Sequence, residues 1–349
     1  MRKVEKDFDN PPPALLNCFI AQKLRIQQYG RNHPFDENCW RNAVTELRTL
    51  YKNKCAYCES AIMPPDNQND SNEIRKYFTI EHYRPKTFYY WLAYEWSNLL
   101  LLCKDCNSGK GDKFPFTGTH PYGMTNKMLS LEHPLTSSNE LDLMKSRAND
   151  CDLLAENASL LHPEIDEPEL YLSFSIDGQI KFADKKLSEE TDKDYEIRQK
   201  RAIDTISINK LDRFNLHQAR LKIINDKKSE LENILTIFFT YANKIEPNKI
   251  SLFTAIAFFP FLTGLNKLQE RHQPFSLFGK VVFDNFKDFF IQPFQEQFGD
   301  DTAELLNYAF CEFLKEQADS KLKILTEKLR ALNTKELSEL IEELQSELK

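Results

Sequence analysis

The stretches CAYC (residues 55–58) and NLLLLCKDCNSGK (residues 98–110) decide how this chain folds. Each holds a C-x-x-C pair, and 44 residues separate the two pairs. A two-residue gap lets both sulfurs of a pair reach one metal ion, and four thiolates complete the tetrahedral shell of a structural Zn²⁺. A redox pair is the alternative, but redox chemistry would not need a second pair. We therefore predict a structural zinc site with the ligands Cys55, Cys58, Cys103 and Cys106.

Between the two pairs lies FTIEHYRPK (residues 78–86), which predicts a short strand with polar residues at its end. The run begins with strand formers, and Pro85 cannot continue a hydrogen-bond ladder. Glu81 and His82 are therefore expected where the strand ends, which is a place from which catalytic side chains often project.

Each polar residue near the two pairs also has a plain structural reading. A single histidine after a strand is more often structural, but the neighbouring Glu81 and the flanking cysteine pairs favour a catalytic role for His82. Asn98 precedes an apolar run and Asn107 follows the last cysteine, and either can be a turn or cap residue. For Asn98, structural bracing and direct function both stay open.

Taken together, these motifs resemble the HNH endonuclease superfamily. The shared features are an acidic residue and a histidine at a strand end, the run N-L-x-x-L-C-x-x-C-N-x-x-K-G and a closing helix. The wording of residues 89–115 and of LLHPEIDEPELYLSF (residues 160–174) resembles the HNH nuclease component of Septu-type two-gene anti-phage systems. Related proteins also act as effectors attached to some retrons. The resemblance covers roughly residues 1–225 and leaves the remainder unassigned.

The resemblance implies a role for each motif residue. His82 would be the general base, because a neutral imidazole has an ordinary pKa of about 6.5. Glu81 and Asn107 would hold a catalytic Mg²⁺ or Mn²⁺ through oxygen atoms, and Asn98 would orient the site by hydrogen bonds. The expected substrate contacts are Lys110, Arg84 and Lys86.

Two positions depart from the commonest HNH pattern. Glu81 precedes the histidine where aspartate is more usual, and Asn107 stands at the final histidine position. An amide oxygen retains metal binding, whereas the longer carboxylate leaves the exact ligand set open.

The predicted fold is α+β: a zinc-knuckled ββα-metal HNH domain with flanking helices, followed by a mostly helical C-terminal domain. Residues 1–120 would hold the N-terminal helices and the HNH domain, and residues 121–190 a connecting region with a β-hairpin. The hairpin is expected around Asp177-Gly178, which lies between alternating apolar runs. Residues 191–349 carry apolar side chains at spacings of three and four, which predicts a helical domain.

Charge and cysteine usage favour a nuclease domain in a cytoplasmic protein. The whole chain has a net charge of −7, but residues 75–113 hold seven Lys or Arg and four Asp or Glu, a local charge of +3. No apolar leader opens the chain, and the apolar stretch 252–265 is interrupted by Pro260 and too short to span a bilayer. The remaining cysteines are expected to be small buried hydrophobes; they are Cys18, Cys39, Cys151 and Cys311.

The resemblance also implies a partner, a companion ABC/SMC-like ATPase that controls the nuclease. Two other functions stay open: a catalytically inactive zinc-dependent module that binds nucleic acid or a partner, and a stand-alone restriction endonuclease. The sequence does not distinguish DNA from RNA as the substrate.

Overall fold

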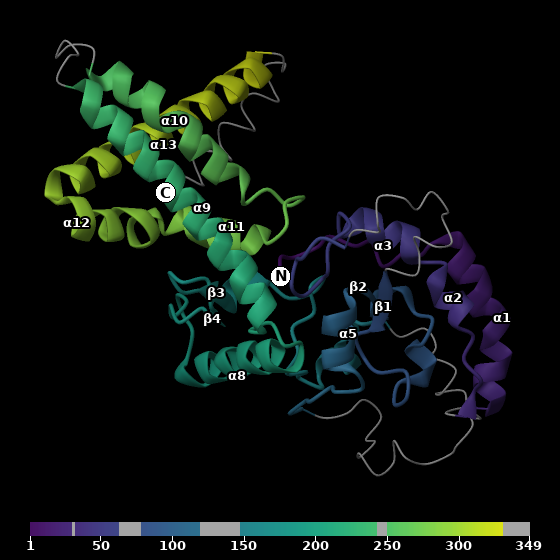
Figure 1. Ribbon diagram of the computed structural model, residues 1–349. Coiled ribbons are helices and arrows are strands. Elements are labelled where there is room, and N and C mark those ends of the chain that lie inside the picture. The colour runs from purple at the N-terminus through teal and green to yellow at the C-terminus, as the bar shows by residue number, and fades with distance from the viewer. Residues whose placement is uncertain (30–31, 63–77, 119–146, 243–249, 331–349) are drawn as a thin grey trace. The chain divides into compact units, whose positions relative to one another are not determined.

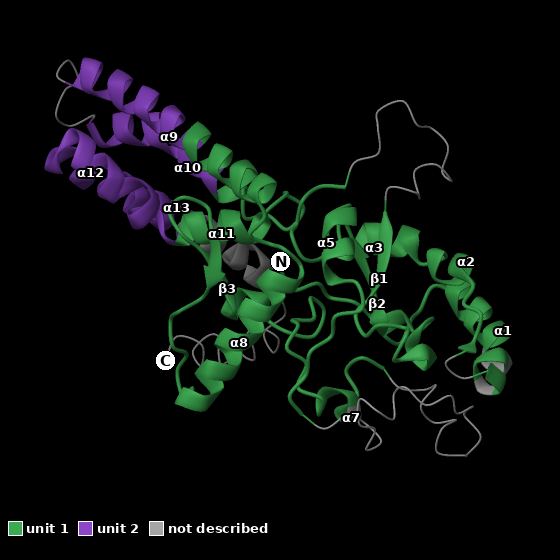
Figure 2. Ribbon diagram, turned by 60° about the horizontal axis from the view of Figure 1, so that its bottom comes forward, with its two compact units in different colours: residues 1–226, 266–284 green, residues 227–265, 285–349 purple. Residues whose placement is uncertain are grey.

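The computed structural model describes residues 1–29, 32–62, 78–118, 147–242 and 250–330, and Figure 1 labels the elements. The chain divides into two compact units, which Figure 2 colours separately. The first unit is Met1–Asp226 with Asn266–Asp284, and the second is Lys227–Leu265 with Asn285–Lys349.

Short helices dominate the first unit. The helices are α1 (Pro13–Tyr29), α2 (Glu37–Arg41), α3 (Val44–Leu50), α5 (Lys104–Lys110), α7 (Cys151–Leu154), α8 (Asp192–Ile208) and α11 (Ser276–Asp284). Helix α9 (Phe214–Ala242) begins in this unit and ends in the second. Short 3₁₀ turns occupy Tyr90–Leu92, Trp96–Asn98 and Pro168–Leu170.

A two-stranded antiparallel sheet forms the centre of the predicted HNH segment. Strand β1 (Thr79–His82) pairs with β2 (Leu99–Leu102), with Thr79 opposite Leu102 and His82 opposite Leu99. All four leucines of β2 are fully buried, since a strand covered on both faces is a continuous apolar run rather than an alternating one. Helices α3 and α5 pack against β2 and β1, so the chain order strand, strand, helix places Glu81 and His82 beside the helix that carries Asn107.

The predicted β-hairpin is confirmed. Strands β3 (Leu172–Phe174) and β4 (Ile180–Phe182) are antiparallel, and Gly178 has a φ of 84°, which glycine adopts without strain. Helix α8 packs on β4 and α11 packs on β3. A capping box at Thr191 begins α8, because its hydroxyl and the Asp194 carboxylate satisfy each other's backbone N–H groups.

The second unit is helical and rich in phenylalanine. It holds the end of α9, α10 (Ile250–Lys267), a π-helical turn (Lys287–Ile291), α12 (Gln292–Phe298) and α13 (Asp300–Arg330). Stacked rings such as Phe286 on Phe310, 4.5 Å between centroids, fill its interior. Most of the described residues after 190 are thus helical.

Helix α10 differs from the expectation for the apolar stretch 252–265. Pro260 lies inside the helix rather than ending it, and α10 extends beyond the stretch on both sides. Among the described helices, α10 alone is long and apolar enough to cross a membrane, judged by length and composition only. Phe261 and Leu265 on this helix are buried in the second unit.

The compact units follow different boundaries from the three predicted segments. The hairpin and α8 fall in one unit with the predicted HNH segment. Helix α11 joins this unit by packing on β3, with Phe278 5.1 Å from Phe174. Residues 119–146 of the predicted connecting region and residues 331–349 of the predicted helical domain lie outside the described residues.

The prediction that the four remaining cysteines are buried holds for Cys39 alone. Cys39 forms a disulfide with Cys18, which is half-buried. Cys151 and Cys311 are exposed, on α7 and α13. Lying outside the C-x-x-C pairs therefore did not identify a buried cysteine.

Candidate active site and metal centre

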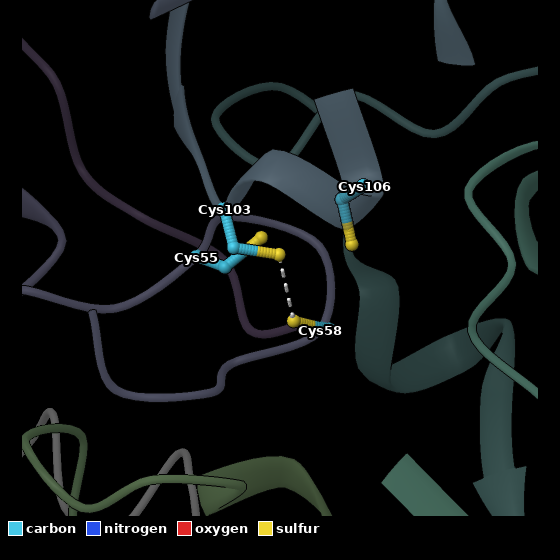
Figure 3. A group of neighbouring side chains, drawn as sticks. All are labelled: Cys55, Cys58, Cys103 and Cys106. Carbon is cyan, nitrogen blue, oxygen red and sulfur yellow. Dashed lines mark hydrogen bonds between the residues drawn. The ribbon is translucent and has the colours of Figure 1, made fainter. Parts of the chain in front are cut away.

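The four cysteines of the two pairs converge on one point (Figure 3). Their Sγ atoms all lie within 4.8 Å of one another, and those of Cys58 and Cys103 are 3.8 Å apart. Zn–S bonds of about 2.3 Å in a tetrahedron place sulfurs roughly 3.8 Å apart. The donor set and its spacing therefore fit a structural zinc ion.

A tight turn presents the first cysteine pair. The amide of Glu59 donates to the carbonyl of Cys55 at 3.0 Å, and Glu59 itself has a φ of 59°. The amide of Ala56 donates to Leu101 at 2.8 Å, which fastens the turn to β2. The second pair follows the same end of β2, where Cys103 is the N-cap residue of α5. The metal centre thus joins the turn after α3 to the start of α5.

His82 lies buried at the end of β1 in a defined tautomer. Its Nε2 lies 2.8 Å from the carbonyl oxygen of Ala93, which can only accept, so Nε2 carries the proton and Nδ1 carries the lone pair. The edge of the ring meets Trp40, with centroids 5.0 Å apart. Burial, aided by the charge of Lys86, lowers the pKa of His82 to about 3. The imidazole is therefore held neutral.

Glu81 and Lys110 form a buried ion pair beside His82. The Lys110 ammonium donates to Glu81 Oε1 at 2.7 Å and to the carbonyl of His82 at 2.9 Å. Burial raises the pKa of Glu81 although Lys110 opposes the rise, and burial lowers the pKa of Lys110. One carboxylate oxygen of Glu81 is thus committed to Lys110 in this structure.

Asn98 braces the loop that follows β1. Its Oδ1 accepts from the Arg84 amide at 2.8 Å, and its Nδ2 donates to the carbonyls of Arg84 at 3.0 Å and Leu92 at 3.1 Å. The side chain is fully buried. The sequence left structural bracing and direct function open for Asn98, and these hydrogen bonds match structural bracing.

A cavity of about 350 Å³ brings several of the predicted site residues together. Glu81, His82, Asn107 and Lys86 all line it. The oxygen atoms of Glu81 and Asn107 are the donor type that Mg²⁺ and Mn²⁺ bind, so the site chemistry fits a catalytic divalent ion. Asn98, Arg84 and Lys110 do not line the cavity.

Other residues of this cavity were missed by the sequence reasoning. They are Glu37, Trp40 and Arg41 of α2, and Asp112 just after α5. The N-terminal residues carry no local motif and reach the site only through the packing of α2. Asp112, which follows the K-G of the motif directly, was the one with a sequence signal.

The predicted substrate contact of Arg84 is not supported. Its guanidinium is buried, pairs with Glu156 at 2.7 Å and donates to the carbonyl of Leu153 at 2.8 Å. A phosphate cannot reach a cation that is enclosed with its counter-ion. Lys110 is likewise buried on Glu81, which leaves Lys86 as the predicted contact that lines the cavity.

Comparison with known proteins agrees with these motifs. The HNH endonuclease family matches residues 55–113. Septu protein PtuB of Bacillus mycoides (strain KBAB4) is 27% identical over 293 residues, which cover 71% of this chain and 86% of that protein. Septu protein PtuB of Bacillus thuringiensis is 40% identical over 104 residues, 29% of this chain and 35% of the relative.

A second kind of relative is matched more locally. Septu protein PtuA of Bacillus mycoides (strain KBAB4) is 24% identical over 153 residues. The match covers 40% of this chain but 17% of PtuA, so it relates a segment of the two proteins rather than their whole lengths.

Proposed function

We propose that this HNH, PtuB-like protein is a metal-dependent endonuclease that hydrolyses nucleic-acid phosphodiester bonds as an anti-phage effector. The observation that carries the proposal is the convergence of Glu81, His82 and Asn107 on one cavity. A base and two oxygen donors there are what phosphodiester hydrolysis requires, because a water must be activated and phosphate charge neutralised.

His82 is the general base of the proposed reaction. Because the carbonyl oxygen of Ala93 accepts a hydrogen bond from Nε2–H, Nδ1 is the atom that takes a proton from the attacking water. The ring cannot rotate freely between Trp40 and this hydrogen bond. Its orientation is therefore set before substrate arrives.

Glu81 and Asn107 hold Mg²⁺ or Mn²⁺ in this proposal, within a ββα-metal arrangement of β1, β2 and α5. The ion supplies charge stabilisation for the phosphate and the leaving oxygen. Lys86, which lines the cavity, binds a substrate phosphate, and Asn98 keeps the loop after β1 in place. The four-cysteine zinc holds the scaffold and takes no part in the chemistry.

The biological setting follows from the relatives. We propose that the protein is cytoplasmic and acts with a PtuA-like companion, an ABC/SMC-like ATPase. We also propose that retron-associated systems use similar effectors. Support for the companion is the local similarity to PtuA. Such a partner also offers a source of nucleic-acid affinity, which the net charge of −7 does not supply.

A cleavage assay tests the proposal. Plasmid, single-stranded DNA and RNA are each incubated with the protein in Mg²⁺ or EDTA, with and without the companion. Cleavage that is lost in EDTA, and lost in the His82→Ala variant assayed alongside, supports the proposal. Discrete fragments without the companion indicate a stand-alone restriction enzyme, and binding without cleavage under every condition indicates an inactive module.

A further inference from the structure

Arg213 reaches the cysteine cluster from a distant part of the sequence. It ends the corner between α8 and α9 (residues 209–213), and its Nη1 donates to Cys106 Sγ at 3.4 Å. Its Nη2 lies 3.6 Å from Cys58 Sγ and 3.7 Å from Cys103 Sγ. One guanidinium therefore contacts three of the four sulfurs.

The corner packs closely on the helix that carries Cys106. Gly109 of α5 faces the carbonyl of Ile208, and a Cβ added at Gly109 would lie 3.0 Å from that oxygen. Arg213 also donates from Nη1 to the carbonyl of Lys210 at 3.1 Å, and its ion pair with Asp105, 3.5 Å away, is weakened because that carboxylate is mostly exposed. The sulfurs are therefore its main buried partners that can carry a negative charge.

A cluster that holds a divalent metal keeps a negative charge, because four thiolates and one Zn²⁺ carry a net charge of −2. We propose that Arg213 is a positioning residue whose guanidinium, in contact with three of the sulfurs, supplies counter-charge to a zinc–tetrathiolate centre. Docking of the α8–α9 corner onto α5 then depends on the bound metal. This inference rests on the structural zinc under the proposed function, and it does not depend on nuclease activity.

Zinc retention by the full-length protein measures the effect. The variants are Arg213→Met, which removes the charge, and Arg213→Lys, which keeps the charge but loses the planar fork. Lys222→Met is the matched control, because it removes a cation from an exposed position of α9. A chelator that reports zinc by colour gives the affinity, and melting temperatures with and without chelator give the stabilisation by zinc.

We expect Arg213→Met to bind zinc about 10- to 100-fold more weakly, the range found when partners of metal ligands are removed. Arg213→Lys should fall between it and wild type, Lys222→Met should match wild type, and the melting temperature in chelator should change little. Zinc affinity within two-fold of wild type in Arg213→Met would overturn the inference.

A separate result covers a variant that does not fold. If Arg213→Met is insoluble, Arg213→Lys must still lose zinc faster than both wild type and Lys222→Met, and equal rates overturn the proposal. Wild-type protein stripped of zinc by the chelator is the reference for complete loss of the metal centre. Absence of cleavage together with Arg213-dependent zinc retention contradicts the nuclease and leaves this inference standing.

Discussion

The Nε2 of His82 donates to the carbonyl oxygen of Ala93 at 2.8 Å, eleven residues along the chain. This one hydrogen bond determines which ring nitrogen can accept a proton, because the neutral imidazole has a single N–H. It also explains why the loop between β1 and β2 (residues 83–98) matters to the site. Three predictions concern residues of this loop.

Replacing Asn98 should destabilise the turn. Asn98→Ala removes three hydrogen bonds and leaves the buried amide of Arg84 without its acceptor. An orphaned buried group costs about 1–3 kcal/mol, and urea unfolding measures the loss. Asn98→Asp is the matched comparison, because its carboxylate keeps an acceptor for the Arg84 amide and loses the N–H donors to the carbonyls of Arg84 and Leu92. An unchanged free energy of unfolding in Asn98→Ala would show that the turn holds without this brace.

Arg84 should contribute to stability and not to substrate binding. Arg84→Met leaves Glu156 buried without its cation, and breaking a buried pair costs about 3–5 kcal/mol. Replacing Glu156 with Gln in the same protein should restore part of that loss. Nucleic-acid affinity, measured at a temperature where the variant is folded, should stay near wild type. A large loss of affinity in folded Arg84→Met protein would return Arg84 to the substrate site.

Lys86 should bind a phosphate. Its ammonium lies 5.3 Å from the centre of the Trp40 ring at the cavity wall. Lys86→Ala should weaken binding to all sequences alike and reduce the slope of log affinity against log salt by about 1. Lys104→Ala, at an exposed position of α5, serves as control. Equal slopes for wild type and Lys86→Ala would mean that the side chain meets no phosphate.

His162 should make the stability of the first unit fall in acid. Its Nδ1 accepts from the Glu164 amide at 3.2 Å and its Nε2 lies 3.3 Å from the Ser97 carbonyl, so the ring fits only in its neutral form. Burial, with the charges of Lys6 and Arg84, lowers the pKa of His162 well below 6.5 in the folded protein.

The unfolded chain therefore takes up a proton near pH 6.5 that the folded chain refuses. His162 alone should lower the free energy of unfolding below that pH by up to about 1.4 kcal/mol per pH unit. Denaturant titrations from pH 8 to 5 test this. His162→Gln should have a slope smaller by that amount, because the buried neutral His82 contributes a slope of its own, and His272→Gln, at an exposed histidine, should keep the wild-type slope. Parallel curves for wild type and His162→Gln would exclude His162 as the source.

Local spacing predicted much of the site. Each cysteine pair and the strand-end position of His82 depend on residues within one turn or one strand, and the structure contains the four-cysteine cluster and this strand. Trp40 was missed because α2 reaches the cavity only by tertiary packing. Arg84 was misassigned because a sequence states a side chain's charge but not its partner, and Glu156 lies 72 residues away.

The boundary of the first unit escaped prediction for a similar reason. Helix α11 joins it from beyond residue 265 by packing Phe278 on Phe174. No periodicity marks which of several apolar helices makes that return. Arg213 likewise carries no motif, although it contacts three sulfurs of the cluster.

The decisive measurement is cleavage by wild type and by His82→Ala, in Mg²⁺ and in EDTA, with the PtuA-like companion present. We expect wild type to cut in Mg²⁺ and not in EDTA, and His82→Ala to cut about 10²- to 10⁴-fold more slowly, the usual contribution of a general base. The variant should retain zinc and its fold. Cutting at the wild-type rate by His82→Ala, in a preparation free of other nucleases, would contradict the role of His82 as general base.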